Sequence, residues 1–312
     1  MLIAGAVDIG GTNTRVALIR EDGFIMAIER FKTPRGLDPV AVPIAAGDAL
    51  LRLAALHPGT ALCGIGVSAA GPVDLNAGSI RHPPNMPFDE VSIVRPLRNL
   101  CNCPVTLMND CRAAVLGEVF TGAGMGFHHV VYITFSTGIG GGVYTDGRVL
   151  LGRGGNAGEI GHFIVDTTYM QSCSCGLSGH WEGYASGKGI TRFFQTWCRV
   201  HEMDPGSPLA TANDILNAAT RGEPVAKLFI GTLARINACG LSIIIVAYDP
   251  EIIILDGPVV VNHPDIILTS AIEHIDRYLD LPKIVISPLG GNAPLLGAAA
   301  AMFRLSERPI LL

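Results

Sequence analysis

Two glycine-rich turns of the same kind constrain the fold of this chain more than any other feature. The first turn motif, DIGGTNTR, covers 8–15 and begins within the last two residues of the apolar segment 3–9. The second turn, STGIGGG, covers 136–142 and follows the apolar segment 130–135. Each turn joins two predicted strands into a hairpin, so the same glycine-rich hairpin motif recurs after about 130 residues. Solenoid repeats run only about 20 to 50 residues. The duplication therefore predicts an α/β fold with two similar lobes and a cleft between them as the natural site.

Composition excludes several classes of protein. The chain has 312 residues, 49% hydrophobic and 16% charged, which is typical of globular chains and not of disordered ones. The net charge of -5 does not fit a basic nucleic-acid binder. The apolar stretch 241–255 is interrupted at Asp249 and Pro250, before the ~20 residues that a membrane span needs. The first residues carry no basic segment of the kind that opens a secretory signal, so we expect a cytoplasmic protein without a membrane partner.

The spacing of apolar residues places one polar pair at a structural junction. Segment 105–108 is predicted as a short strand, and apolar residues then recur at helical spacing from Cys111 onward. Asn109 and Asp110 therefore lie where a strand passes into a helix. Further helices are expected at 264–279 and at 294–305.

The glycine-rich turns carry the first chemical signal. Glycines permit positive φ and leave backbone N–H groups to face an anion, and Thr12 adds a hydroxyl. Asp8 could hold a Mg²⁺ ion through water, since this ion keeps several waters and takes few carboxylates. The alternative is that each turn only closes a hairpin. Two such turns could grip opposite ends of a polyphosphate, although neither is a Walker P-loop.

Polar residues elsewhere fit the handling of hydroxyl groups. Asp110 is ionised at neutral pH and could accept a hydroxyl proton, or it could cap the helix that follows. Asn109 could hydrogen-bond hydroxyls. Glu159 and His162, three residues apart, could grip two neighbouring hydroxyls.

Taken together, these motifs resemble those of the ROK family of sugar kinases, in the actin-like ATPase superfamily. The resemblance runs along nearly the whole chain. It rests on both turns, on Asn109 and Asp110, and on two further motifs, GNAGEIGH at 155–162 and CSCGLSGHWE at 173–182. It implies two actin-like, ribonuclease H-like α/β lobes with a cleft between them. The smaller lobe would comprise 1–110 with the last helix, 298–312, and the larger lobe 111–297, with a zinc-binding loop.

The resemblance also implies roles for individual residues. Asp110 would be the general base that receives the hydroxyl proton of a hexose. The sugar would contact Asn85, Asn109, Asp110, Glu159, His162 and Glu182. The phosphates and adenosine of ATP, bound with Mg²⁺, would contact Asp8, Gly10, Gly11, Thr12, Asn13, Thr137, Gly138 and Gly257. Asp256 and Pro258 stand where the family usually has glycines, so this chain departs from the family at the adenosine.

A structural zinc site is the remaining implication. His162, Cys173 and Cys175 match three of the family's ligands, and His180 stands where the family has a cysteine. Imidazole also binds zinc, so a site of two histidines and two cysteines is chemically sound. The alternative is a loop of free thiols.

These implications lead to an expected function. The resemblance favours ATP-dependent phosphorylation of glucose to glucose 6-phosphate, as in glycolysis, by a homodimer or higher homo-oligomer. A kinase of N-acylhexosamines or other hexoses is the first alternative. A sugar-sensing regulatory protein without kinase activity is the second, although a net charge of -5 does not suit DNA binding.

Overall fold

The structure is a computed structural model, and it describes residues 1–59, 61–83, 86–205 and 211–307. Contacts divide the chain into two compact units. Unit 1 comprises Met1–His128, Gly142–Ala157 and Pro288–Leu312, and unit 2 comprises His129–Gly141 and Gly158–Ser287. The expected lobe boundary at residue 110 stays a prediction.

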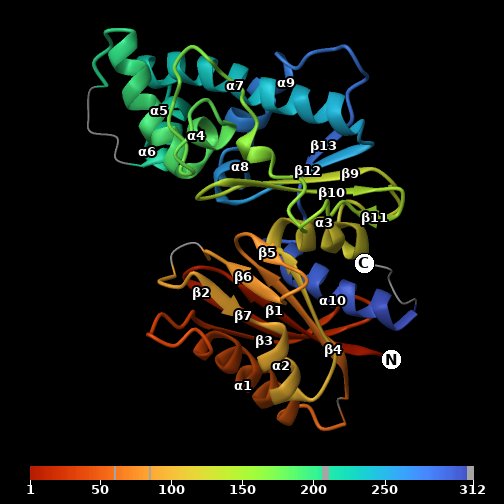
Figure 1. The fold of residues 1–312 in the computed structure, drawn as a ribbon. Helices are drawn as coiled ribbons and strands as arrows, with labels where there is room; N and C mark the ends of the chain where they lie inside the picture. Colours follow the sequence, from red (N-terminus) through yellow and green to blue (C-terminus); the bar gives the residue numbers. More distant parts are fainter. Residues whose placement is uncertain (60, 84–85, 206–210, 308–312) are drawn as a thin grey trace. The chain divides into compact units, whose positions relative to one another are not determined.

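The sheet of unit 1 has five strands in the order β3-β2-β1-β4-β8 (Figure 1). Strand β2 pairs antiparallel with both β1 and β3, whereas β4 pairs parallel with β1 and with β8. This arrangement brings the end of β1, with the first glycine-rich turn, next to the end of the parallel strand β4, and the end of β8 lies beyond β4. The strands are β1 (Ile3–Ile9), β2 (Asn13–Arg20), β3 (Ile25–Lys32), β4 (Leu62–Ala69) and β8 (Val105–Asn109).

Helices cover both faces of this sheet. Side chains alternate along β1, so Val7 and Ile9 pack on the face with α1 and α2, while Ala4 and Ala6 pack on the face with α10. Helix α3 follows β8 directly and lies against α10. The helices are α1 (Ala41–Ala55), α2 (Val94–Cys101), α3 (Asp110–Thr121) and α10 (Ala293–Glu307), and a small sheet contains β5 (Val73–Asp74), β6 (Ser79–Arg81) and β7 (Glu90–Ser92).

The second five-stranded sheet repeats the plan of the first. Its order is β11-β10-β9-β12-β13, and β12 pairs parallel with β9 and with β13. In both sheets the first strand of the hairpin lies in the centre and the two later strands lie beyond it. The duplication expected from the two turns is therefore confirmed. The strands are β9 (Val130–Phe135), β10 (Ile139–Thr145), β11 (Arg148–Val149), β12 (Ile252–Asp256) and β13 (Lys283–Ile286).

Unit 2 contains β9, β12, β13 and the first part of β10, whereas the rest of β10 and β11 belong to unit 1. Among the described residues, unit 2 also contains eight helical segments. They are η1 (Ile160–His162), α4 (Trp181–Ala185), α5 (Gly187–Val200), α6 (Ala212–Thr220), α7 (Pro224–Tyr248), α8 (Pro258–Asn262), η2 (Asp265–Thr269) and α9 (Ser270–Ile272). The helix expected over 264–279 is wrong beyond residue 272. There, the backbone N–H of Asp276 donates to Ser242 Oγ and that of Tyr278 donates to the Asp276 side chain, so side chains replace helical acceptors.

Helix α7 is long and apolar enough to cross a membrane by length and composition alone. Most of its most apolar window is buried inside the protein, however, and the helix ends at Tyr248, before Asp249 in the left-handed region. Helix α7 thus has the burial of a core helix.

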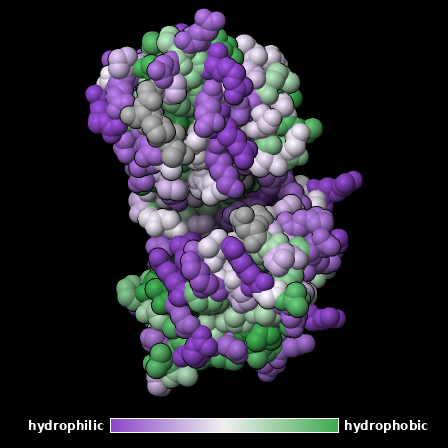
Figure 2. All heavy atoms as spheres, turned by 90° about the vertical axis from the view of Figure 1, so that its left-hand side faces the viewer, coloured by the Kyte–Doolittle hydropathy of each residue, from purple (hydrophilic) through white to green (hydrophobic). Residues whose placement is uncertain are grey.

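On the face drawn in Figure 2, purple hydrophilic residues lie among green hydrophobic ones on both units.

Glycines let α10 approach its neighbours with backbone against backbone. A Cβ on Gly66 of β4 would lie 1.8 Å from the carbonyl oxygen of Ala298, and one on Gly117 of α3 would lie 2.2 Å from that of Ala293. A Cβ on Gly297 of α10 would lie 1.6 Å from the carbonyl oxygen of Ala113. These contacts leave no room for any side chain, so they fix α10 against both α3 and β4.

We expect Gly297→Ala to lower the free energy of unfolding by about 1–3 kcal/mol or more, because the new methyl group would overlap the Ala113 carbonyl. Gly231→Ala in α7 is the control, since no atom lies within 4 Å of its added Cβ. That change should stabilise by roughly 0.5–1 kcal/mol. Urea unfolding of both variants measures the difference, and equal stabilities would contradict the packing argument.

Candidate functional site

The first glycine-rich turn is held by hydrogen bonds from inside unit 1. The backbone N–H of Gly10 donates to the Asn13 carbonyl at 3.0 Å, and a Cβ on Gly10 would lie only 2.9 Å from that oxygen. Arg35 Nη2 donates to the Gly11 carbonyl and to Thr12 Oγ1. Neither Gly10 nor Gly11 has a positive φ. The turn therefore does not use the positive φ that glycine permits, and it needs Gly10 for close approach instead.

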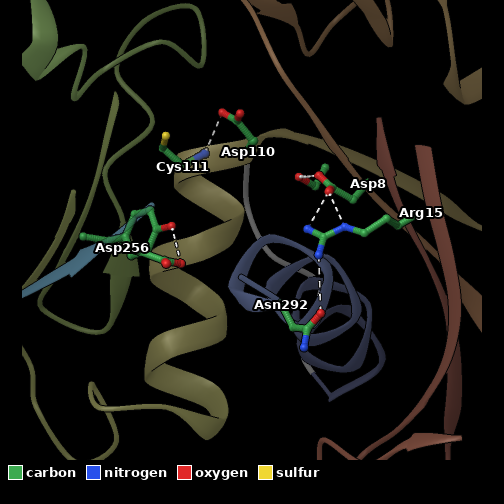
Figure 3. A network of polar contacts seen from close by, with 8 residues as sticks. Asp8, Arg15, Asp110, Cys111, Asp256 and Asn292 are labelled. Carbon is green, nitrogen blue, oxygen red and sulfur yellow. Dashed lines mark hydrogen bonds and ion pairs between the residues drawn. The ribbon is translucent and has the colours of Figure 1, made fainter. Parts of the chain in front are cut away.

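Asp8, at the edge of this turn, is bound by two protein side chains. Its Oδ2 accepts from Arg15 at 2.7 Å (Nη2) and 3.0 Å (Nε), and its Oδ1 accepts from Ser68 Oγ at 2.9 Å (Figure 3). A carboxylate has about four acceptor positions, so three donors leave room for a water. That geometry fits the expected contact with Mg²⁺ through water.

Asn109 and Asp110 lie at the junction of β8 and α3, as the apolar spacing predicted. Asn109 is the N-cap of α3: its Oδ1 accepts from the backbone N–H of Cys111 at 2.9 Å, and its Nδ2 donates to the Gly71 carbonyl. Asp110 is the first residue of the helix, half-buried, and its Oδ1 also accepts from Cys111 N, at 2.8 Å. The cap is thus Asn109 and not Asp110.

The second glycine-rich turn is joined to the loop that carries the cysteines, within unit 2. Glu182 Oε2 accepts from the backbone N–H of Ile139 at 3.1 Å, while its Oε1 accepts from Ser174 Oγ. A Cβ on Gly138 would lie 2.3 Å from Glu182 Oε2, so this glycine makes room for the carboxylate. Gly138 has no positive φ, as in the first turn, and Thr137 is exposed. The role of Glu182 as a sugar contact stays a prediction.

The four expected zinc ligands lie together. The ligand atoms of His162, Cys173, Cys175 and His180 all lie within 4.8 Å of one another. The two Nδ1 atoms of the histidines are 3.2 Å apart, and Cys175 Sγ is 3.3 Å from the Nδ1 of His180. A tetrahedral zinc with bonds of about 2.0–2.3 Å needs ligand atoms about 3.3 to 3.8 Å apart. The set, including His180, fits such an ion.

Burial shifts the pKa of two of these four residues. Desolvation raises the pKa of the Cys173 thiol to about 11, and it lowers the pKa of His180, with the neighbouring His162 acting in the same direction. The lowered pKa favours the neutral form of His180, which is the form that binds a metal. Cys173 holds its proton without a metal, so metal binding releases a proton there.

His162 and Glu159 lie at the two ends of the short helix η1. Glu159 is its N-cap residue and is exposed, while His162 is the last residue of the helix. Because Nδ1 of His162 lies 3.2 Å from Nδ1 of His180, within the candidate metal cluster, Nε2 is the ring nitrogen that points away from that cluster.

Beyond β12, the backbone at Gly257 requires a glycine. Gly257 has φ +94°, and a Cβ there would lie 2.4 Å from the Phe135 carbonyl. Asp256 is buried, and its Oδ2 accepts from Tyr132 OH at 3.0 Å (Figure 3). Its Oδ1 accepts from the backbone N–H of Gly257 at 2.7 Å. The departure from the family at Asp256 thus gives this residue a structural role beside the expected nucleotide contact.

Sequence reasoning missed Arg15 and Ser68, the partners of Asp8. Their register was the available signal, because both stand opposite Asp8 on neighbouring strands. Asn85, a predicted sugar contact, lies outside the described residues.

We expect Asn109→Ala to lower the free energy of unfolding by about 1 kcal/mol, since it removes the N-cap of α3. Asn109→Asp keeps an oxygen that can accept from Cys111 N, so it should restore most of the stability. Thermal or urea unfolding of the pair measures this effect. A loss of equal size in both variants would contradict the role of Asn109 as the cap.

Comparison with known proteins identifies the family whose sequences and structures this chain resembles. The family model described as "ROK family" matches residues 4–304. A glucokinase of Pyrobaculum calidifontis is 32% identical to the chain over 306 residues, which covers 96% of this chain and 95% of that protein. The structure is similar to that of a ROK hexokinase from Thermus thermophilus, with a TM-score of 0.85 and 30% identity over 98% of this chain and 99% of that one.

A second solved structure extends the comparison to a complex. It is a ROK family glucokinase from Streptomyces griseus in complex with glucose and AMPPNP, with a TM-score of 0.75 and 28% identity, covering 97% of this chain and 99% of that one. The motifs, the two similar sheets and these matches agree along nearly the full length of the sequence. The chain belongs to the ROK family.

Proposed function

We propose that this protein transfers the γ-phosphoryl group of ATP to a hexose, with glucose as the first candidate, giving glucose 6-phosphate. The observation that carries the proposal is the placement of Asp110 at the start of α3, beside Asn109, in a chain that resembles glucokinases over nearly its whole length. A titratable carboxylate at this position supports the handling of a hydroxyl proton.

The chemistry follows from these residues. The hexose hydroxyl oxygen attacks the γ-phosphorus, the bond to the ADP oxygen breaks, and Asp110 receives the hydroxyl proton. Its carboxylate is held in place because Oδ1 accepts from Cys111 N. Phosphoryl transfer depends mainly on positioning and on stabilising charge, and Mg²⁺, when bound with the nucleotide, would neutralise the phosphates.

The remaining site residues support binding. We assign Asn109, Glu159, His162 and Glu182 to the sugar, and the two glycine-rich turns with Asp8 and Gly257 to the nucleotide. The structure supports His162 in particular, since its Nδ1 points to the metal ligands, so that a zinc there would fix the orientation of the ring. Zinc would position a substrate contact without taking part in the reaction.

We expect Asp110→Asn to reduce turnover by roughly a hundred- to ten-thousand-fold while the affinity for the sugar stays within several-fold, because an amide cannot accept the proton. Asp89→Asn is the control, since the Asp89 side chain is fully exposed. The measurement is ADP release with MgATP and a panel of glucose, mannose, fructose, allose, N-acetylglucosamine and N-acetylmannosamine. Near-normal turnover of the Asp110 variant would remove this residue as the base. Binding of a sugar by the wild-type protein without any phosphorylation would favour a sugar sensor.

For the metal site we expect about one zinc per chain by elemental analysis of the dialysed protein. Cys175→Ser should lower the zinc content strongly, because a hydroxyl is a poor ligand for this ion. Cys239→Ser, which changes a partly buried thiol on α7, should leave it unchanged. A folded wild-type protein without metal would contradict the assignment.

A further inference from the structure

A row of polar side chains crosses the sheet of unit 1 at the first glycine-rich turn. Asp8 on β1 stands opposite Arg15 on β2 and opposite Ser68 on β4. The next residue of the row is Arg30 on β3, the register partner of Arg15. Arg30 is exposed. Side chains of register partners lie on the same face of a sheet and are near neighbours. The contacts of Asp8 therefore follow from strand pairing.

Arg15 and Ser68 together fix the carboxylate of Asp8. Arg15 places two nitrogens on Oδ2, and Ser68 places its hydroxyl on Oδ1, so donors hold both oxygens. The side chains of Asp8 and Arg15 are only 16% and 18% exposed. A partly buried, forked ion pair of this kind restricts rotation far more than an exposed pair does.

Arg15 is itself held from a third direction. Its Nη1 donates to Asn292 Oδ1 at 3.4 Å, and Asn292 immediately precedes α10 (Figure 3). The guanidinium thus links the turn hairpin to the start of the helix that packs on this face of the sheet. An arginine held on two sides cannot turn away from Asp8 without breaking both contacts.

We propose that Arg15 is a positioning residue, which orients the Asp8 carboxylate to accept a hydrogen bond from a water bound to the Mg²⁺ ion of the nucleotide. The inference rests on the proposed function. Three protein donors leave about one acceptor position on the carboxylate. A guanidinium beside the carboxylate opposes direct binding of a second cation, and Mg²⁺ gives up its waters reluctantly. Contact through water is the arrangement that satisfies both constraints.

The test compares Arg15→Met with Arg30→Met, which removes the same charge from the next position in the same row. Calorimetry gives the Kd of AMPPNP with excess Mg²⁺ and with EDTA, and the ratio of the two values measures the preference for the metal complex. We expect Arg15→Met to reduce this preference about tenfold while metal-free binding stays within twofold. Turnover should fall by roughly 10- to 100-fold with an unchanged KM for the hexose. Arg30→Met should match the wild type.

Arg15→Lys provides the conservative variant, because an ammonium group can restore one of the two hydrogen bonds to Asp8. We expect its metal preference to lie between those of the wild type and Arg15→Met. If Arg15→Met does not fold, as judged by circular dichroism, the lysine variant carries the same comparison with Arg30→Met.

Each other result overturns the inference in a recognisable way. An equal loss of affinity with and without Mg²⁺ would show that Arg15 contacts the phosphates itself. A higher metal preference in the variant would show that Arg15 only competes with the ion for Asp8, and an unchanged one would leave a purely structural ion pair. If the wild-type protein neither binds AMPPNP nor phosphorylates a hexose, the proposed function itself fails, whatever the Arg15 variants do.

Discussion

The contact of α10 with α3 and β4 is the constraint on which unit 1 depends. Three glycines, Gly66, Gly117 and Gly297, bring the backbones of three elements together with no side chain between them. Interiors packed this closely adjust little, so the positions of these elements are coupled. The start of α3, with Asn109 and Asp110, and the residue before α10, Asn292, are thereby fixed relative to the same sheet. The catalytic proposal for Asp110 and the positioning proposal for Arg15 both depend on this packing.

In unit 2 the corresponding constraint is the set of polar contacts made by the residues at the start of helix α4. Helix α4 has only five residues, yet His180 precedes it as the N-cap residue and Glu182 lies within its first turn. His180 belongs to the group of four residues that we propose to hold a metal, while Glu182 accepts a hydrogen bond from the backbone of the second glycine-rich turn. Trp181 between them is fully buried, with its Nε1 donating to Asn237 on α7. One short helix therefore ties the metal loop to the turn and anchors both in the core.

The sequence predicted what depends on periodicity and repetition. Both hairpins and the junction at Asn109 follow from alternation and spacing, which are local properties, and the repeated hairpin predicted two similar lobes. The pairing of Asp8 with Arg15 could not be predicted in the same way, because it depends on the register between strands. Glycine permits positive φ, but Gly10 and Gly138 do not adopt it and instead make room for an oxygen atom, which depends on contacts that the sequence does not show. The helix over 264–279 was overestimated, since a side chain from α7 captures the backbone at Asp276. The four candidate zinc ligands followed from the resemblance to the family, and the structure brings their ligand atoms within 4.8 Å of one another.

The position of α10 in the chain has a consequence for synthesis. All other elements of unit 1 precede it, and most of unit 2, Gly158–Ser287, is translated between them and this helix. The sheet face that α10 covers, lined by Ala4, Ala6 and Ala17, stays open on the ribosome until residues 293–307 emerge. At about 5–20 residues per second, more than 150 residues separate α3 from its partner helix by roughly ten seconds or more. A nascent chain of this protein therefore exposes an incomplete first unit while the second is already able to fold.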